Sequence, residues 1–262
     1  MIKLVVTDID GTLLDDNKNL SPDFWETAGQ LAQKGIIFSV ASGRQYHALR
    51  NQFAPIADDM LFISDNGACA VYKNRELFTE SLDPEAARNF IKIGRAITGA
   101  RPVLCGKTAT RIENDEENLI TELKRFYVEL QRVDDLTQVG DTILKVTMFD
   151  FFDVEKNVRP HFRQYEQQYR IIPSDKLLLD ISTLAASKGA ALRRIQRQLG
   201  ISPEETLVFG DYLNDLEMMQ EAAHSYAMKN AHPEVIKAAR FVTEHDNNNH
   251  GVVRTIRKLC LG

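Results

Sequence analysis

The sequence predicts an α/β fold in which a parallel sheet is interrupted by an inserted α+β segment. The first third alternates short apolar runs with longer amphipathic stretches, which is the pattern of strand-helix-strand units. The same pattern returns near the end, so both ends of the chain complete one sheet. With 262 residues the chain is long enough for two domains that need no disulfides. We therefore predict a core domain of residues 1–82 and 183–262 and an inserted domain of residues 83–182.

The first part of the chain is predicted to begin the parallel sheet. Apolar runs predict strands from Leu4 to Thr7, from Ile36 to Ala41 and from Leu61 to Ser64. Between the first two strands, Ser21-Pro22 resembles an N-cap followed by proline at the first helical position. Gly35 is expected to end that helix, because glycine is common just past helix C-termini.

The middle of the chain has a different rhythm. After Asn66-Gly67 a small hairpin is predicted within residues 69–79, and Asp83-Pro84 opens a new helix. Up to residue 182 the pattern mixes helices with short strands. The main elements are an acidic helix, a strand from Ile143 to Phe149, a helix from Asp153 and strands near Arg170 and 177–181. This mixture predicts a separate α+β unit.

The parallel pattern resumes after residue 182. A helix is predicted from Gly189 to Leu199 with Gly200 as its stop, followed by a capping box at Ser202 to Glu205. A strand from Thr206 to Phe209 comes next. The tail adds short strands at 225–228 and 241–243, and helices that begin near Asn214, Pro233 and Gly251.

Composition narrows the classes of partner. A net charge of -5 and a pI near 5.7 argue against nucleic acid, because a phosphate backbone requires a basic surface. Three scattered cysteines without CxxC spacing suit a reducing compartment and give no zinc signature. The amino terminus lacks the features of a signal peptide, and no apolar run approaches the roughly 20 residues of a membrane helix. We expect a cytoplasmic protein without membrane or nucleic-acid partners.

Polar residues follow three of the predicted strands. They form the segments Asp8-Ile9-Asp10-Gly11-Thr12, Ser42-Gly43-Arg44 and Gly210-Asp211. Ligands of open parallel sheets bind beyond the carboxyl ends of the strands, so these segments are expected to face one cleft. Asp8 and Asp10 can lean to the same side, where their carboxylates repel unless a cation or a proton lies between them. With Asp211 as a third oxygen donor, the set suits Mg²⁺.

Each of these pieces alone has a structural explanation. An isolated Asp-x-Asp-Gly is more often a turn than a catalytic site, and a serine before a helix is usually only an N-cap. Lys188 alone would normally be a solvated charge. The conjunction of all the pieces in one chain is what favours a catalytic site.

Four ordered motifs resemble those of the haloacid dehalogenase superfamily. They are Asp8-Ile9-Asp10-Gly11-Thr12-Leu13-Leu14, Ser42-Gly43-Arg44, Ser187-Lys188-Gly189 and Gly210-Asp211-Tyr212-Leu213-Asn214-Asp215. Asn66-Gly67-Ala68, the segment 227–231 and Gly251-Val252 are similar to the Cof-type sugar-phosphatase branch. The resemblance implies a doubly wound, Rossmann-like core with a C2-type cap inserted between the second and third motifs. It also implies a magnesium-dependent phosphatase of small phosphorylated metabolites, such as sugar phosphates or pyridoxal phosphate.

The resemblance also implies roles for single residues. Asp8 would be the nucleophile that forms an aspartyl-phosphate, which divides one difficult displacement into two easier ones. Asp10 would act as general acid and then as general base, and burial against Asp8 is expected to raise its pKa. Mg²⁺ would be held by the Asp8 side chain, the Asp10 backbone carbonyl and Asp211.

The phosphoryl group would be bound by a second set of residues. Lys188 would neutralise both Asp8 and a phosphoryl oxygen, and Asp215 would orient Lys188 or a metal-bound water. The other expected contacts to phosphate are Ser42, the backbone amides of Ile9 and Gly43, and Asn214.

Several positions keep two interpretations. Arg44 either reaches phosphate or is solvated, and Asn66 either contributes to the cleft or only forms a turn. Tyr212 is bulkier than the small residue often found there, and it either narrows the cleft or points away. In the cap, possible substrate contacts are Arg101, Lys107 and Arg111.

Two other functions stay open. A phosphotransferase or phosphomutase would use the same nucleophile but return the group to an acceptor other than water. A non-catalytic sensor of a phosphorylated metabolite would bind without turnover, although such a binder has no need of a nucleophile. Release of free phosphate would distinguish the phosphatase from a phosphotransferase or mutase and from a sensor.

Overall fold

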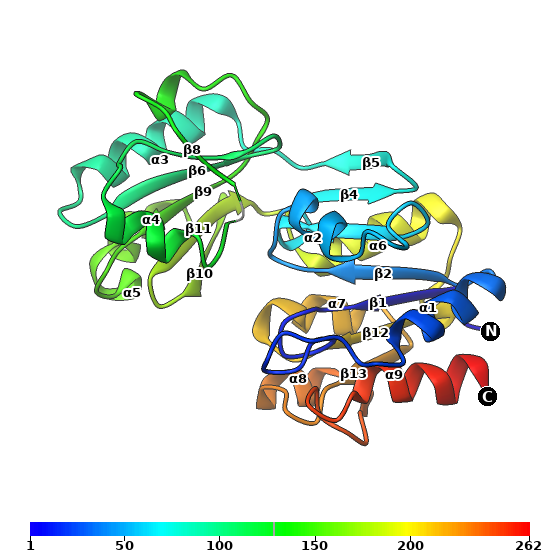
Figure 1. Cartoon of the computed structure of the whole chain (residues 1–262). Helices are drawn as coiled ribbons and strands as arrows, with labels where there is room; N and C mark the ends of the chain where they lie inside the picture. Colours follow the sequence, from blue (N-terminus) through cyan, green and yellow to red (C-terminus); the bar gives the residue numbers. More distant parts are fainter. Residues whose placement is uncertain (128) are drawn as a thin grey trace. The chain divides into compact units, whose positions relative to one another are not determined.

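The computed structural model of the chain describes residues 1–127 and 129–262. The chain folds into two compact units, one of Met1–Phe78 with Ser187–Gly262 and the other of Thr79–Ala186 (Figure 1). The sequence-based boundaries assign residues 79–82 and 183–186 to the core domain, whereas these short segments pack within the second unit. The first unit is therefore built from both ends of the chain.

The first unit is organised around a sheet of eight strands in the order β14-β13-β12-β1-β2-β3-β4-β5. The strands from β14 to β3 pair in parallel, and β4 pairs antiparallel with β3. The strands are β1 (Leu4–Thr7), β2 (Ile37–Ala41), β3 (Leu61–Ser64), β4 (Cys69–Tyr72), β5 (Arg75–Thr79), β12 (Thr206–Gly210), β13 (His224–Ala227) and β14 (Phe241–Val242). The central strands are apolar and fully buried, as expected for a parallel sheet covered on both faces. The predicted α/β class is confirmed.

Helices of the first unit form two packed groups. Helix α1 packs against α9, while α6 packs against α7 and α7 against α8. Their bounds are α1 (Phe24–Gln33), α2 (Tyr46–Gln52), α6 (Lys188–Leu199), α7 (Leu216–Gln220), α8 (Pro233–Ala238) and α9 (Gly251–Ile256). Single turns lie at η1 (Asp65–Gly67), η5 (Pro203–Glu205) and η6 (Leu213–Asp215), and a π-helical turn, η7 (Arg257–Leu261), ends the chain.

Helix α1 begins later than the sequence predicted. The backbone N–H of Phe24 donates to the Ser21 carbonyl at 3.0 Å, which closes a turn before the helix. Ser21 is therefore part of that turn, its hydroxyl accepting a long 3.4 Å bond from the Asp23 amide, and it is not the N-cap. The prediction was wrong at this position because a proline one residue after serine also suits a tight turn.

The second unit has a six-stranded sheet in the order β10-β11-β9-β6-β7-β8. All described pairs are antiparallel except β7 with β8. The elements are α3 (Pro84–Ala96), β6 (Arg101–Gly106), β7 (Thr110–Ile112), α4 (Glu117–Leu123), β8 (Leu130–Arg132), η2 (Leu136–Gln138), β9 (Ile143–Phe149), α5 (Val154–Asn157), η3 (Arg159–His161), η4 (Arg163–Tyr165), β10 (Tyr169–Asp175) and β11 (Leu178–Thr183). One apolar cluster packs α3 against the sheet, and a second packs α4 against other strand residues. None of the helices in the described part of the chain has the length and apolar character that spanning a bilayer requires.

The register of the central strands brings distant parts of the sequence together. Strand β1 lies between β12 and β2, and Thr7 is opposite Phe209 on one side and Val40 on the other. The residues that follow these strands therefore emerge at the same edge of the sheet. They are Asp8, Ser42 and the segment that begins at Asp211.

Gly67 is expected to be a sensitive point of this edge. Its φ of +98° is unfavourable for side-chain-bearing residues, and a Cβ there would lie 2.2 Å from the Ser187 carbonyl oxygen. Gly67→Ala should therefore lower the thermal unfolding midpoint by more than the few degrees that correspond to about 1–2 kcal/mol of backbone strain. Gly200→Ala is the matched control, because Gly200 has a φ of +65° with open space around its Cα. Equal shifts in the two variants, measured by calorimetry, would contradict the close packing of Gly67.

Candidate active site

Three carboxylates gather at the edge of the first sheet. Asp8, Asp211 and Asp215 each offer an oxygen within 4.8 Å of the others. Asp8 directly follows β1, and its backbone N–H donates to the Phe209 carbonyl of β12 at 3.0 Å. Asp215 is fully buried and Asp8 is 8% exposed, so the cluster is largely shielded from water. Such a group of acids needs protons or a cation to hold it together.

Lys188 supplies a buried positive charge to this cluster. Its Nζ donates to Asp8 Oδ1 at 2.5 Å and to Asp215 Oδ1 at 2.7 Å. It is the first residue of α6, whose N-cap Ser187 accepts a hydrogen bond from the Ala190 amide. Burial alone would lower the pKa of Lys188, but the carboxylates of Asp215 and Asp8 raise it above its ordinary value. The lysine therefore stays charged in the interior.

Two of the acids hold protons unusually strongly. Burial raises the pKa of Asp8 to about 8 in spite of Lys188, with Asp215 and Asp211 adding to the rise. Burial likewise raises the pKa of Asp211 to about 6, although a hydrogen bond from Thr12 acts in the opposite direction. An oxygen-only donor set that retains protons near neutral pH suits a hard divalent cation, which would replace those protons. The residues present therefore fit Mg²⁺.

Asp215 uses both carboxylate oxygens within the protein. Oδ1 accepts from Lys188, and Oδ2 accepts from the backbone amides of Asp211 and Tyr212 at 3.0 and 3.2 Å. These bonds hold the loop that carries Asp211 and orient the lysine. The supporting role predicted for Asp215 stays a prediction, and these contacts are what such a role requires.

The Asp10 side chain does not join the cluster of acids. Its carboxylate accepts bonds from Arg44 Nε at 2.9 Å and Nη2 at 2.6 Å, and from Lys18 Nζ at 2.8 Å. Partial burial would raise the pKa of Asp10, but the hydrogen bonds from Arg44 and Lys18 outweigh burial and lower it. The expected rise from burial against Asp8 is wrong, because two cations lie beside this carboxylate.

Predicted phosphate-binding residues come together beside the acids. Ser42 is buried at the end of β2, and its Oγ accepts from the Arg44 amide at 3.2 Å. Asn66 donates its backbone N–H to the Ser42 carbonyl at 2.9 Å and accepts at Oδ1 from Asn214 Nδ2 at 3.1 Å. A Cβ on Gly43 would lie 3.1 Å from the Asn66 amide nitrogen. Ser42, Gly43, Asn66 and Asn214 are thus neighbours.

Ile9 and Gly11 contribute through the backbone. The side chain of Ile9 is fully buried in the core, so only its backbone can face the site. Gly11 has a φ of +80°, and a Cβ there would lie 2.5 Å from Asp211 Oδ2. The turn after Asp10 therefore requires glycine both for its conformation and for room beside Asp211.

Sequence reasoning assigned no role to three residues that the structure brings to the site, namely Thr12, Lys18 and Gln52. Thr12 Oγ1 donates to Asp211 Oδ1 at 2.6 Å and so orients a predicted metal ligand. Its position directly after Asp-x-Asp-Gly was the signal available. Gln52 accepts from Arg44 Nη1 at 2.9 Å. Neither Lys18 nor Gln52 carried such a signal, because a loop lysine and a helix-end glutamine are ordinary surface residues.

Tyr212 is 59% exposed, and its ring contacts the ring of His232 edge-on.

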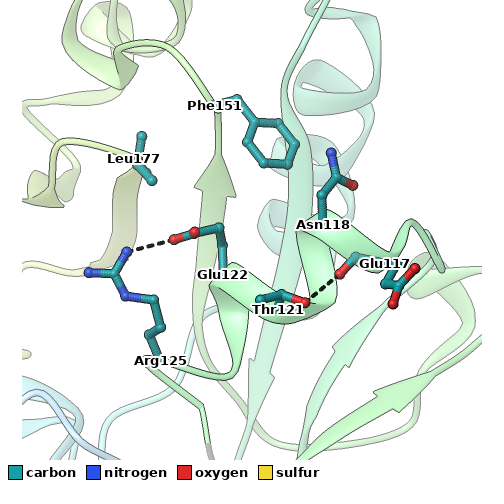
Figure 2. A pocket seen from close by; sticks show the side chains of 7 residues that line it. All are labelled: Glu117, Asn118, Thr121, Glu122, Arg125, Phe151 and Leu177. Atoms are coloured by element: carbon teal, nitrogen blue, oxygen red, sulfur yellow. Dashed lines mark hydrogen bonds and ion pairs between the residues drawn. The ribbon is translucent and has the colours of Figure 1, made fainter.

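The second unit contains none of the catalytic residues predicted from the sequence. Of the cap residues proposed as substrate contacts, Arg101 and Arg111 form ion pairs with Glu116 and Asp141. A hollow of about 780 Å³ on this unit is shown in Figure 2. The Glu122–Arg125 ion pair lies at its side. Its described lining is Glu117, Asn118, Thr121, Glu122, Arg125, Phe151 and Leu177, and it includes no residue assigned to catalysis.

Comparisons with known proteins agree with this geometry. Residues 5–256 match the model of the haloacid dehalogenase-like hydrolase family. Among curated relatives, the 5-amino-6-(5-phospho-D-ribitylamino)uracil phosphatase YbjI of Escherichia coli is 29% identical, covering 98% of this chain and 96% of that protein. The phosphatase YwpJ of Bacillus subtilis is 26% identical over 98% of this chain and all of that protein.

Solved structures extend the likeness to three dimensions. A protein from Eubacterium rectale has a TM-score of 0.91 at 30% identity, with 98% of each chain covered. TM0651 from Thermotoga maritima has a TM-score of 0.89 at 25% identity, with both chains fully covered. The resemblance inferred from the four motifs is confirmed: the chain is an enzyme of the haloacid dehalogenase-like hydrolase family.

Proposed function

We propose that the chain is a magnesium-dependent phosphatase that hydrolyses small phosphomonoesters through an aspartyl-phosphate on Asp8. The observation that carries the proposal is the contact of Lys188 with Asp8 inside a buried cluster of carboxylates. This arrangement places a nucleophile, a fixed positive charge and hard oxygen donors together. Membership of the family and the named activities of YbjI and YwpJ support the reaction class.

In the first half-reaction, an Asp8 oxygen attacks phosphorus while the bond from phosphorus to the leaving oxygen breaks. The ammonium of Lys188, held by Asp215, offsets repulsion between the Asp8 carboxylate and the anionic phosphoryl group. Mg²⁺, held by Asp8, Asp211 and the Asp10 carbonyl, would supply further neutralisation of that charge. The leaving oxygen takes a proton from Asp10.

The phosphoryl oxygens are bound by the residues gathered beside Ser42. Its hydroxyl, the amides of Gly43 and Ile9, and the Asn214 side chain would donate hydrogen bonds to them. The bond between Asn66 and Asn214 holds the latter at the edge of the site. Asn214 is therefore held in position before substrate binds, which limits the reorganisation that its contact with phosphate requires.

In the second half-reaction, Asp10 acts as a base. It removes a proton from water as the water oxygen attacks phosphorus and the bond from Asp8 to phosphorus breaks. Arg44 and Lys18 keep Asp10 ionised, which suits a base, but Asp10 must turn away from these cations and gain a proton to serve as the acid. The acid-base role therefore includes a movement of this side chain.

The substrate is proposed to be a small phosphorylated metabolite. YbjI is named for such a compound, and it covers nearly the whole of this chain. We further propose that the enzyme acts in the cytoplasm without a nucleic-acid or membrane partner, in keeping with a net charge of -5. Sugar phosphates are the first substrates to test.

Asp8→Asn should abolish phosphate release, because an amide cannot form the phosphorylated intermediate. We expect the loss to be roughly 10⁴-fold or more. The measurement is phosphate release from sugar phosphates, pyridoxal phosphate and nitrophenyl phosphate with and without Mg²⁺. Asp59→Asn, at an exposed position, is the control and should retain activity. Turnover that survives Asp8→Asn would refute the mechanism, and an isomerised sugar without free phosphate would indicate a mutase.

Without divalent cations, stability should fall as pH rises above 3.8, with the contribution of Asp211 lost by about pH 6 and that of Asp8 lost by about pH 8. Asp211 and Asp8 keep their protons up to these values when folded, but lose them near 3.8 when unfolded. The folded state thus binds more protons in this window, and stability falls with pH under that condition. Mg²⁺ should oppose the fall because it replaces the protons.

The check is the thermal unfolding midpoint from pH 4 to 9, measured in chelator and again in Mg²⁺. Asp211→Asn should make the fall between pH 4 and about 6 in chelator less steep, since that variant has no carboxyl at this position to retain a proton there. A midpoint that rises through this window in chelator would show that the acids are not buried together as described.

Asp10→Asn should separate the two half-reactions. Nitrophenolate leaves without a proton, so a burst of nitrophenol should persist while steady turnover falls about 10²–10⁴-fold for lack of a base. A sugar phosphate, whose alkoxide does need a proton, should show no burst. Stopped-flow absorbance and rapid-quench measurements test this, and full steady-state activity on both substrates would remove Asp10 from the mechanism.

A further inference from the structure

The Asp10 carboxylate is shared by two cations. Arg44 contacts both of its oxygens, and Lys18 contacts one of them at 2.8 Å. In the described part of the chain, the only other side chain bonded to Arg44 is Gln52, and the Lys18 ammonium makes no other hydrogen bond. One carboxylate is therefore hydrogen-bonded to two cations at the edge of the phosphate site, and the Asp16 carboxylate also acts on Lys18 through its charge.

The guanidinium of Arg44 and the backbone at Lys18 are held in place by neighbours that do not belong to the cluster of acids. Arg44 is fixed at its far side by Gln52, at 2.9 Å. Lys18 lies in a tight loop that is closed by its own amide on the Asp15 carbonyl, at 2.9 Å, and by the Asn19 amide on the Asp15 carboxylate, at 2.7 Å. The position of the Arg44 charge and the backbone from which Lys18 reaches Asp10 are thus set before any substrate arrives.

The loop of Lys18 is anchored to the opposite end of the sequence. The carboxylate of Asp16 accepts from Asn247 Nδ2 at 3.0 Å and from Asn248 Nδ2 at 2.9 Å. Lys18 itself has a φ of +65°, a conformation that residues other than glycine rarely adopt. Strained positions of this kind persist where the surrounding structure enforces them, and they gather at ligand sites.

The proposed reaction removes the partner of these cations. When Asp10 turns to the leaving oxygen, Arg44 and Lys18 lose the carboxylate to which both are hydrogen-bonded. Two like charges left together repel, so an anion that replaced the carboxylate would favour the movement. The guanidinium of Arg44 presents a planar fork that matches a carboxylate or a phosphate.

We infer that Arg44 and Lys18 form a subsite for a second anionic group, carboxylate or phosphate, on the leaving-group side of the substrate. The inference rests on the proposed phosphatase activity and narrows its substrate class to phosphomonoesters that carry another negative charge. Arg44 follows Ser42 and Gly43 directly, so the subsite lies next to the residues proposed to hold the transferred group. The second anion exchanges with Asp10 and frees it for proton transfer.

The test compares substrates that differ only in the second charge. Phosphoglycerate and glycerol phosphate have the same skeleton with a carboxylate or a hydroxymethyl group, and a sugar bisphosphate is compared with its monophosphate. The wild-type enzyme should favour the more anionic member of each pair in kcat/KM. Lys18→Met should reduce this preference about tenfold, mainly through KM, which is the usual effect of losing one charged hydrogen bond.

Two further variants control for charge and for fold. Lys18→Arg keeps the cation and should keep the preference. Lys258→Met removes an equally exposed lysine that pairs with Glu244 at 2.6 Å, and it should leave every ratio unchanged. The thermal unfolding midpoint of each variant is measured to test that the fold is retained.

The alternatives give different patterns. An equal loss on both members of each pair would mean that Lys18 serves the transferred phosphoryl group or only positions Asp10, and it would overturn the inference. If Lys18→Met left the substrate preference unchanged, the contact between Lys18 and Asp10 would be only a surface ion pair. That result would also overturn the inference. Absence of turnover of every substrate by the wild-type enzyme would refute the proposed function itself, and the subsite with it.

Discussion

The buried ammonium of Lys188 is the interaction on which the site depends. It joins Asp8, which follows the first strand, to Asp215, which follows β12, and all three side chains lie inside the protein. An unpaired charge at this depth would be strongly unfavourable, so each partner requires the other two. Because Asp215 also holds the amides of Asp211 and Tyr212, the lysine indirectly fixes the loop that completes the oxygen cluster.

This arrangement follows from the pairing of β1 with β12 and β2. Because of their parallel register the three strands end side by side, so the polar segments that follow them lie at the same edge of the sheet. The composition of the site is therefore a consequence of topology: the Asp8 carboxylate, the Ser42 hydroxyl and the Asp211 carboxylate lie at one edge because their strands are neighbours. The glycines at 11 and 67 allow the backbone to approach closely at two points of this edge.

Much of this could be predicted from the sequence, and the failures have physical causes. Strands β1, β3 and β9 were predicted with the observed bounds, because buried apolar runs are a strong signal. The direction of the pKa shift of Asp10 was not predicted, because it depends first on the contact with Arg44, for which two interpretations were left open, and then on Lys18. The loop of Lys18 is anchored through Asp16 to Asn247, 231 residues away in sequence. Nothing in the sequence singles out Asn247, yet it is buried and its side-chain amide donates to the Leu14 carbonyl. Side-chain contacts of this range leave no periodic pattern in the sequence.

The division of the first unit between both ends of the chain has a consequence for its synthesis. Strand β1 emerges from the ribosome first, but β12, which pairs with one of its edges, is made only after the entire second unit. At about 5–20 residues per second, that edge of β1 waits roughly ten seconds or longer. The continuous second unit can fold within this interval, while the β1 edge keeps open hydrogen-bonding groups of the kind that promote association between strands. The nascent chain is thus most vulnerable to aggregation before residue 206 has been added, and Asp8 acquires its lysine partner only late in translation.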